Sequence, residues 1–150
     1  MSFPTQILPE HHQHCDDLFV AAEQAMQGGD WSTAASACER FSRQMKAHFA
    51  AEEEMLFPAF EAATGNSSGP TRVMRMEHDQ MRPLLEQLEQ ACTARDDDAF
   101  SGAAETLLIL MQQHNMKEEN ILYPMCDQAL GPEAERIGAQ ISATLEKRHA

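Results

Sequence analysis

One stretch of this sequence occurs twice, with the two copies 66 residues apart. Each copy has a histidine, a glutamate four residues later, and then a leucine, an aromatic residue and a proline. The copies are His48-x-x-x-Glu52 with Leu56-Phe57-Pro58, and His114-x-x-x-Glu118 with Leu122-Tyr123-Pro124. Residues four apart lie one turn apart on the same face of an α-helix. Since both copies share one register, a chance pair of neighbours on a solvated face is a poor explanation.

The repeat continues towards the N-terminus without a gap, and it adds a second histidine to each copy. At the same offset, His12 matches His78. The apolar residues after them also correspond, as Cys15 with Met81, Leu18 with Leu84, Phe19 with Leu85 and Ala22 with Leu88. A unit of this length that is used twice is typical of a repeated pair of helices.

Three neighbouring histidines compete for the first of these positions, namely His11, His12 and His14. Only His12 has apolar residues three, six, seven and ten positions later, which is the stripe of a helix that faces a core. We therefore take His12 as the site residue. His11 and His14 are expected to be exposed, and one of them replaces His12 if the first helix is rotated about its axis.

The composition favours helix throughout the chain. Ala, Met, Leu, Gln and Glu are abundant, whereas the chain has one Tyr, one Trp and no run of alternating apolar residues. We expect an all-α protein, an antiparallel up-down four-helix bundle with a short C-terminal helix, as a single domain over residues 1–150. The core bundle covers about 8–128, with repeat halves at about 8–63 and 71–130.

The breaks in the pattern place the individual helices. Residues 1–9 carry two prolines and are expected to be an entry segment, and Asp30 or Ser32 caps the second helix. Pro58 removes a backbone donor and predicts a kink or a weak point there. The predicted helices cover about 8–27, 30–63, 71–94, 99–130 and 133–147, and residues 64–70 form a loop between the repeats.

Charge and cysteine usage exclude several classes of partner. The formal net charge of −13 makes nucleic acid and anionic membrane surfaces unfavourable partners. The sequence shows no secretory leader pattern and no long apolar run, so neither export nor membrane insertion is predicted. The four cysteines are widely spread without a Cys-x-x-Cys pair, which indicates reduced thiols in a cytoplasmic protein.

The residues predicted to face the core together make a metal site the best interpretation. They are His12, His48, Glu52, His78, His114 and Glu118. Any one buried histidine is more readily explained as a structural residue, but six polar groups at one depth need partners, and a metal centre satisfies all of them. Two carboxylates in such a core commonly bridge a pair of ions about 3.5–4 Å apart. Imidazole together with carboxylate favours iron over copper, so we predict two iron ions, with a bridging oxide or hydroxide, or a bound anionic ligand, completing the charge balance.

These motifs, together with Glu77-His78, resemble the hemerythrin-like (HHE cation-binding) family of bacteria over about residues 8–128. The resemblance implies a non-haem di-iron centre with the four histidines as terminal ligands and Glu52 and Glu118 as bridges. Family members bind dioxygen or nitric oxide, sense oxygen or redox state, or help to repair iron–sulfur centres. The oxygen carriers have a further histidine one turn from the third-helix histidine, where this chain has Met74 and Arg82. The pattern is therefore more similar to the iron-centre repair proteins.

The leading prediction is a cytoplasmic di-iron protein that binds or senses O2 or NO, or supports iron-centre repair under oxidative or nitrosative stress. Its partners would be a small diatomic ligand and an iron-centre protein. The alternative is a di-iron oxidase or reductase that acts on O2, peroxide or NO. A third interpretation is a structural module whose centre holds zinc or no metal.

Residues next to the predicted ligands have less definite roles. Glu53 and Glu119 directly follow the two glutamates and either support the predicted ligands as hydrogen-bond partners or, since on an ideal helix they point away from the shared face, are solvated. Arg82 lies one turn from His78, where it either brings a positive charge to the site or forms an outward salt bridge. The residues expected to form apolar pocket walls are Met45, Met81 and Met111.

Overall fold

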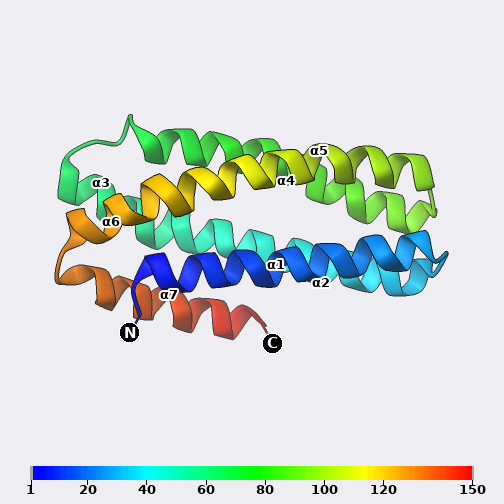
Figure 1. The fold of residues 1–150 in the computed structure, drawn as a ribbon, viewed down its shortest axis with the longest axis horizontal. Coiled ribbons are helices and arrows are strands. Elements are labelled where there is room, and N and C mark those ends of the chain that lie inside the picture. The colour runs from blue at the N-terminus through cyan, green and yellow to red at the C-terminus, as the bar shows by residue number, and fades with distance from the viewer. Residues whose placement is uncertain (1, 150) are drawn as a thin grey trace.

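The computed structural model describes residues 2–149, and most of these residues are helical, with no strand among them. Four long helices lie lengthwise beside one another, and a fifth runs along the outside of the first two (Figure 1). The four are α1 (Pro4–Gln27), α2 (Trp31–Ala51), α4 (Pro70–Ala94) and α5 (Asp97–Lys117), and the fifth is α7 (Glu133–His149). The prediction of an all-α chain is confirmed.

Tight turns join α1 to α2 and α4 to α5, and the two turns are built alike. Asp30 accepts a hydrogen bond from the backbone N–H of Thr33 at 3.1 Å, and Asp96 accepts one from Ala99 at 3.0 Å. Each aspartate therefore satisfies one unpaired amide at the start of the following helix. The predicted cap at Asp30 is confirmed, and its repeat counterpart Asp96 caps α5 in the same way.

The start of α1 differs from the prediction, because the helix begins at Pro4 rather than near residue 8. A proline at the first helical position loses no hydrogen bond, since that amide has no acceptor within the helix. Pro9 lies inside the helix and removes one bond, but Leu8 beside it is completely buried, in an apolar cluster that also includes residues of α7. Packing of this first turn therefore outweighs the local cost of the proline.

Each repeat contains a short π-helical turn, a feature that the sequence did not predict. The turns are η1 (Glu52–Leu56) and η2 (Glu118–Leu122), followed by α3 (Phe57–Thr64) and α6 (Tyr123–Leu130). In η1 the N–H of Phe57 donates to the carbonyl of Glu52, five residues back. Pro58 has no N–H to donate, and the Arg75 guanidinium bonds the Glu53 carbonyl at 3.4 Å. The predicted kink at Pro58 is therefore a widened turn.

Two apolar clusters fill the interior on either side of the predicted site residues. One lies towards the α1–α2 and α4–α5 turns and includes Phe19, Phe41, Phe100 and all three predicted pocket-wall methionines. The other gathers residues of η1, η2, α3, α6 and α7. The residues of α7 in this second cluster are Ala134, Ile137, Ile141 and Leu145. Burying each of the three larger side chains stabilises the fold by about 1.5–3 kcal/mol. The helix α7 therefore forms part of the core and does not pack only on its outside.

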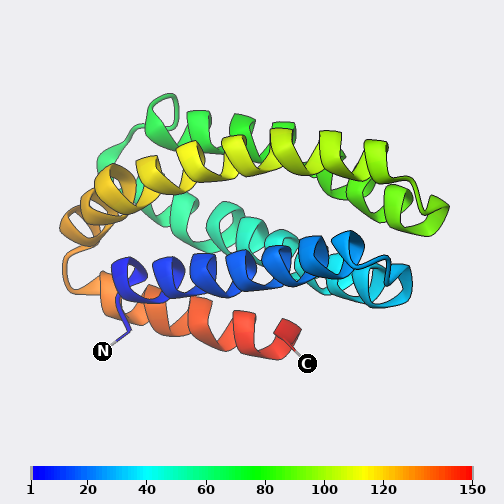
Figure 2. The ribbon, with the colours of Figure 1, turned by 45° about the vertical axis from the view of Figure 1, so that its right-hand side comes forward.

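The N-terminal segment crosses α7 at a glycine (Figure 2). A Cβ atom at Gly138 would overlap the carbonyl group of Ser2, so the crossing requires the absence of a side chain there. None of the helices within residues 2–149 is both long enough and apolar enough to cross a membrane.

Candidate metal centre

The structure brings all six predicted site residues together in the middle of the bundle. His12 comes from α1, His48 from α2, Glu52 from η1, His78 from α4, His114 from α5 and Glu118 from η2. All six are buried, with at most 5% of any one exposed. These residues form two groups. Within each group, the atoms that could bind a metal lie within 4.8 Å of one another. The His78–His114 group contains Glu52, His78, His114 and Glu118, and the His12–His48 group contains His12, His48 and Glu118.

In the His78–His114 group, four buried polar atoms face one another without a hydrogen bond. Glu52 Oε1 lies 3.0 Å from His78 Nε2, and Glu118 Oε2 lies 3.3 Å from His114 Nε2. None of these four atoms has a hydrogen-bond partner among the described residues. Leaving a buried polar atom unpartnered costs about 1–3 kcal/mol. A cation between the four atoms would satisfy all of them, and two imidazoles with two carboxylates suit iron.

In the His12–His48 group, the same kinds of atoms surround the hydroxyl of Tyr123. That oxygen lies 2.6 Å from Glu52 Oε2 and 2.8 Å from Glu118 Oε1. It also lies 3.3 Å from His48 Nε2 and 3.4 Å from His12 Nε2. Sequence reasoning missed Tyr123 as a site residue, although its place in the repeated aromatic-proline motif was a signal.

Three of the four histidines hold a carboxylate at the ring nitrogen that faces away from the centre. The Nδ1–oxygen distances are 2.6 Å for His12 with Glu119, 2.6 Å for His78 with Glu53, and 2.8 Å for His114 with Glu77. A carboxylate in this position fixes the ring orientation and leaves Nε2 available to a metal. Both Glu53 and Glu119 therefore have the predicted role of partners to the site histidines, and Glu119 is also exposed as predicted, whereas Glu53 is half-buried. Each reaches a histidine on a neighbouring helix, which the angle around its own helix does not show.

The fourth histidine, His48, is held by a second histidine. His48 Nδ1 lies 2.8 Å from His11 Nδ1, and His11 Nε2 lies 3.0 Å from Gln44 Oε1. With the His11 Nε2–H donating to Gln44, His11 Nδ1 accepts from His48, and His48 Nε2 keeps its lone pair towards the centre. The expectation that His11 is exposed is wrong, because it is half-buried and supports His48.

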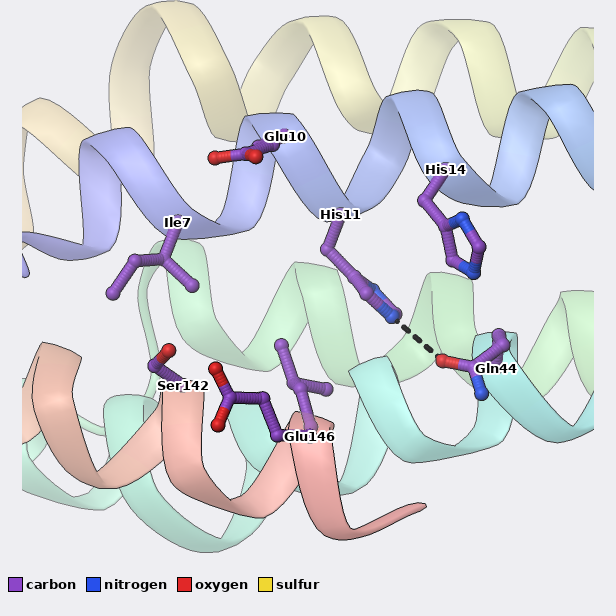
Figure 3. A pocket seen from close by; sticks show the side chains of 8 residues that line it. Ile7, Glu10, His11, His14, Gln44, Ser142 and Glu146 are labelled. Carbon is purple, nitrogen blue, oxygen red and sulfur yellow. Dashed lines mark hydrogen bonds between the residues drawn. The ribbon is translucent and has the colours of Figure 1, made fainter. Parts of the chain in front are cut away.

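His11 also lines a cavity of about 380 Å³ between α1, α2 and α7 (Figure 3). His14, Glu10, Ser142 and Glu146 lie around the same cavity. His14 is half-buried rather than exposed as predicted. Neither His11 nor His14 is among the residues of the two metal-type groups, in which His12 is the histidine of α1.

Two of the three supporting carboxylates are paired with cations. Arg82 Nη2 lies 2.9 and 2.8 Å from the two oxygens of Glu53, and Lys117 Nζ lies 2.5 Å from Glu77 Oε2. Arg82 was predicted either to bring a positive charge to the site or to form an outward salt bridge. In the structure it pairs with Glu53, which in turn bonds His78, so its charge lies beside the site. Glu119 has no Lys or Arg partner among the side chains that the structure describes.

The buried charges shift the pKa values of the site residues strongly. Burial lowers the pKa of His48 to about 3. Burial also lowers the pKa of His114, but the facing Glu118 carboxylate outweighs it and raises the value to about 9. Burial and the neighbouring Glu52 raise the pKa of Glu118. Two carboxylates this close in a buried site resist joint ionisation, and a bound cation would remove that cost.

The bundle thus buries four histidines and two glutamates together. A site of this composition is typical of a metal-binding protein. The family model described as the hemerythrin HHE cation binding domain matches residues 4–126, and the chain belongs to this family. The resemblance predicted from the motifs is confirmed.

The chain is also similar to curated relatives. It is 33% identical over 92 residues to the iron-sulfur cluster repair protein YtfE of Escherichia coli O81 (strain ED1a). It is 32% identical over 92 residues to the protein of the same name from Escherichia fergusonii. Each match covers 54% of this chain and 41% of the relative, so the chain matches about two fifths of the relatives' length. No solved structure matches significantly.

Proposed function

We propose that this chain is a non-haem di-iron protein with the antiparallel four-helix topology of hemerythrin-like domains. In this proposal it binds or senses O2 or NO, or supports the repair of iron centres in oxidative or nitrosative stress. The observation that carries the proposal is the set of four buried, unpartnered atoms in the His78–His114 group, which point at one another. Such buried atoms need compensation, and a cation bound between them would compensate all four at once.

The positions of the oxygens support two ions rather than one. Glu118 Oε2 faces His114 at 3.3 Å, whereas Glu118 Oε1 faces His12 at 3.1 Å. Glu52 divides in the same way, with Oε1 at 3.0 Å from His78 and Oε2 at 3.5 Å from His48. In this proposal His12 and His48 hold one ion, His78 and His114 hold the other, and both glutamates bridge. Iron in such a site supplies redox chemistry and open coordination positions for a diatomic ligand.

The repair role rests on the relatives, whose name states that they repair iron–sulfur clusters. A partner of this chain would then be a protein with a damaged iron–sulfur centre. A cytoplasmic location is part of the proposal. It agrees with four free, buried cysteines, of which Cys38 and Cys92 are joined by a thiol hydrogen bond at 3.2 Å between the sulfur atoms rather than by a disulfide.

Elemental analysis of anaerobically purified protein, with absorption spectra before and after air, tests the proposal. We expect about two irons per chain and near-ultraviolet bands that grow on oxidation. Incubation with an iron–sulfur protein that lacks part of its cluster then tests iron transfer. Zinc or no metal in a folded chain would contradict the di-iron proposal. Sustained consumption of O2, peroxide or NO with a reductant would instead identify an enzyme.

A further inference from the structure

The two repeats place equivalent residues around the centre, but four matched positions differ in chemistry. Positions 66 residues apart carry the same predicted ligands and the same supporting carboxylates, Glu53 and Glu119. The four that differ are His11 against Glu77, Asp16 against Arg82, Ala51 against Lys117, and Phe57 against Tyr123. Each of these eight residues lies beside the predicted ligands or their hydrogen-bond partners.

The first consequence is a difference in charge. Around the His78–His114 group, Arg82 is paired with both Glu53 and Asp79, and Lys117 is paired with Glu77, so two cations offset most of the charge of three carboxylates. Around the His12–His48 group, Glu119 is joined by Asp16 in the position of Arg82. Neither carboxylate has a Lys or Arg partner among the described side chains. The His12 side of the centre is therefore the more negative side, and it attracts cations.

The second consequence is access. A cavity of about 500 Å³ lies between α1 and the α5–η2 segment, and its lining includes His12, Glu119 and Asp16. Most of the remaining lining is polar, from the amide side chains of Gln13, Gln112, Asn115 and Asn120. A hydrated cation can exchange water for carboxylate and amide oxygens along such a wall. The cavity thus connects solvent with the buried ring of His12.

The third consequence concerns the atoms that a metal would bind. The Tyr123 hydroxyl lies within 3.4 Å of His12, His48, Glu52 and Glu118, so without an ion it can donate its one hydrogen to a carboxylate of Glu52 or Glu118. Phe57 occupies the matching place beside His78, with its ring centroid 5.8 Å away, and it has no hydroxyl. An ion therefore leaves the His12–His48 group at a lower cost than it leaves the His78–His114 group.

We propose that the two iron positions are inequivalent, and that the ion at His12 and His48 is the exchangeable one. It enters and leaves as a hydrated ferrous ion through the α1–α5 cavity, guided by Asp16 and Glu119. The ion at His78 and His114 stays in place. This inference rests on the proposed di-iron function and specifies which ion moves. A protein that donates iron would deliver the ion at His12 and His48 and keep the other.

Release of iron to an excess of a ferrous chelator, followed anaerobically by the colour of the complex, tests the inequivalence. We expect two phases of equal amplitude whose rates differ at least about tenfold. Glu119→Gln keeps the side-chain shape and removes the charge behind His12, and such changes weaken metal affinity about 10–100-fold. It should accelerate the fast phase only. The matched variant Glu53→Gln, at the repeat position behind His78, should accelerate the slow phase only.

The outcomes separate the two proposals. Fewer than two irons per wild-type chain would refute the di-iron function itself. Two irons that leave in one phase, or a Glu119→Gln variant that changes the slow phase, would overturn the inequivalence and leave the function standing. Helix content by circular dichroism shows that each variant is folded.

Capture of ferrous ion by the metal-free chain tests the route. Asp16→Lys reverses the charge on the cavity wall without changing a predicted ligand. The matched control is Asp17→Lys, which makes the same change at an exposed neighbour outside the lining. At low salt we expect capture by Asp16→Lys to slow about tenfold and capture by Asp17→Lys to change less than about twofold, with the difference shrinking as salt is added. Equal slowing of the two variants would exclude this route.

Discussion

The two halves of the centre have nearly the same geometry and different surroundings. His12 lies 5.9 Å from the Tyr123 ring and His78 lies 5.8 Å from the Phe57 ring, measured between centroids. Their outer nitrogens both lie 2.6 Å from a carboxylate oxygen, of Glu119 and of Glu53 respectively. The repeat therefore fixes where the predicted ligands lie. The charged and hydroxyl-bearing neighbours, which the repeat does not preserve, decide how firmly each position holds a cation.

The largest effect should come from Glu118, which the two halves share. It is the one residue present in both metal-type groups found within residues 2–149. We expect Glu118→Ala to lower the affinity for both ions by a factor on the order of 1000, because removing one partner of a buried charge cluster costs about 3–5 kcal/mol. Iron per chain after desalting measures this. Glu54→Ala, an exposed change in the same kind of turn, serves as the control and should keep two ions.

The packing behind the two π turns should respond alike in both halves. Leu56 and Leu122 are repeat counterparts, and each is at most 1% exposed. We expect Leu56→Ala and Leu122→Ala each to lower the free energy of unfolding of the metal-free chain by about 2–5 kcal/mol. Urea unfolding measures both, with the exposed Met76→Ala changing it by less than about 0.5 kcal/mol. A large loss in one half only would show that the asymmetry extends into the core.

The repeat-related histidines His48 and His114 should give the metal-free chain opposite responses to pH. The pKa of His114 is raised to about 9 in the fold, because the Glu118 carboxylate outweighs burial. Its stabilising contribution is complete below the unfolded pKa of about 6.5 and is lost as the pH rises through about 9. The pKa of His48 is lowered to about 3 by burial, so stability falls as the pH drops below about 6.5.

Between pH 5 and 9.5 the change amounts to about 3 kcal/mol for His114 and about 2 kcal/mol for His48. Urea midpoints between pH 5 and 9.5 test them. His114→Gln should flatten the alkaline side of the profile, and His48→Gln should flatten the acid side. If both variants changed the same side, the two histidines would not differ as the structure indicates.

The smallest effect concerns the Tyr123 hydroxyl. Tyr123→Phe makes this position the same as its counterpart Phe57 and leaves buried carboxylate oxygens without their donor. We expect the metal-free chain to lose about 1–2 kcal/mol of stability, and the iron-loaded chain to lose less. Thermal unfolding of both forms measures the difference. An equal loss in the two forms would mean that the hydroxyl does not serve the metal-free centre.

The sequence predicted those parts of the site that depend on spacing within one helix. The four-residue separation of His48 and Glu52 and the apolar stripe after His12 are local features, and the repeat supplied a second copy of each. The all-helical fold followed from the same periodicity. These properties depend on the geometry of a regular α-helix, which sequence spacing reports directly.

The missing parts depend on contacts between helices and on the irregular turns. An ideal helix turns by about 100° per residue, which points Glu53 and Glu119 away from the face of the glutamates. Both instead lie in π turns, which take about one more residue per turn, and both bond to a histidine of another helix. Tyr123 and Phe57 match in the motif, and only the packed structure shows that one hydroxyl lies between two carboxylates.

The π turns also restrict how the length of this chain can change. Each turn holds one more residue than an α-helical turn would need, so a deletion within 52–56 or 118–122 could restore regular helix locally. Because the extra residue is taken up within a single turn, the same deletion would leave the following helix near its present rotation but would remove the wide turn that holds Glu53 or Glu119. A loop such as residues 64–70 tolerates a gained or lost residue far better, because no helical face depends on its register. Aligned relatives should therefore vary in length at that loop and keep a constant number of residues from the histidine to the proline.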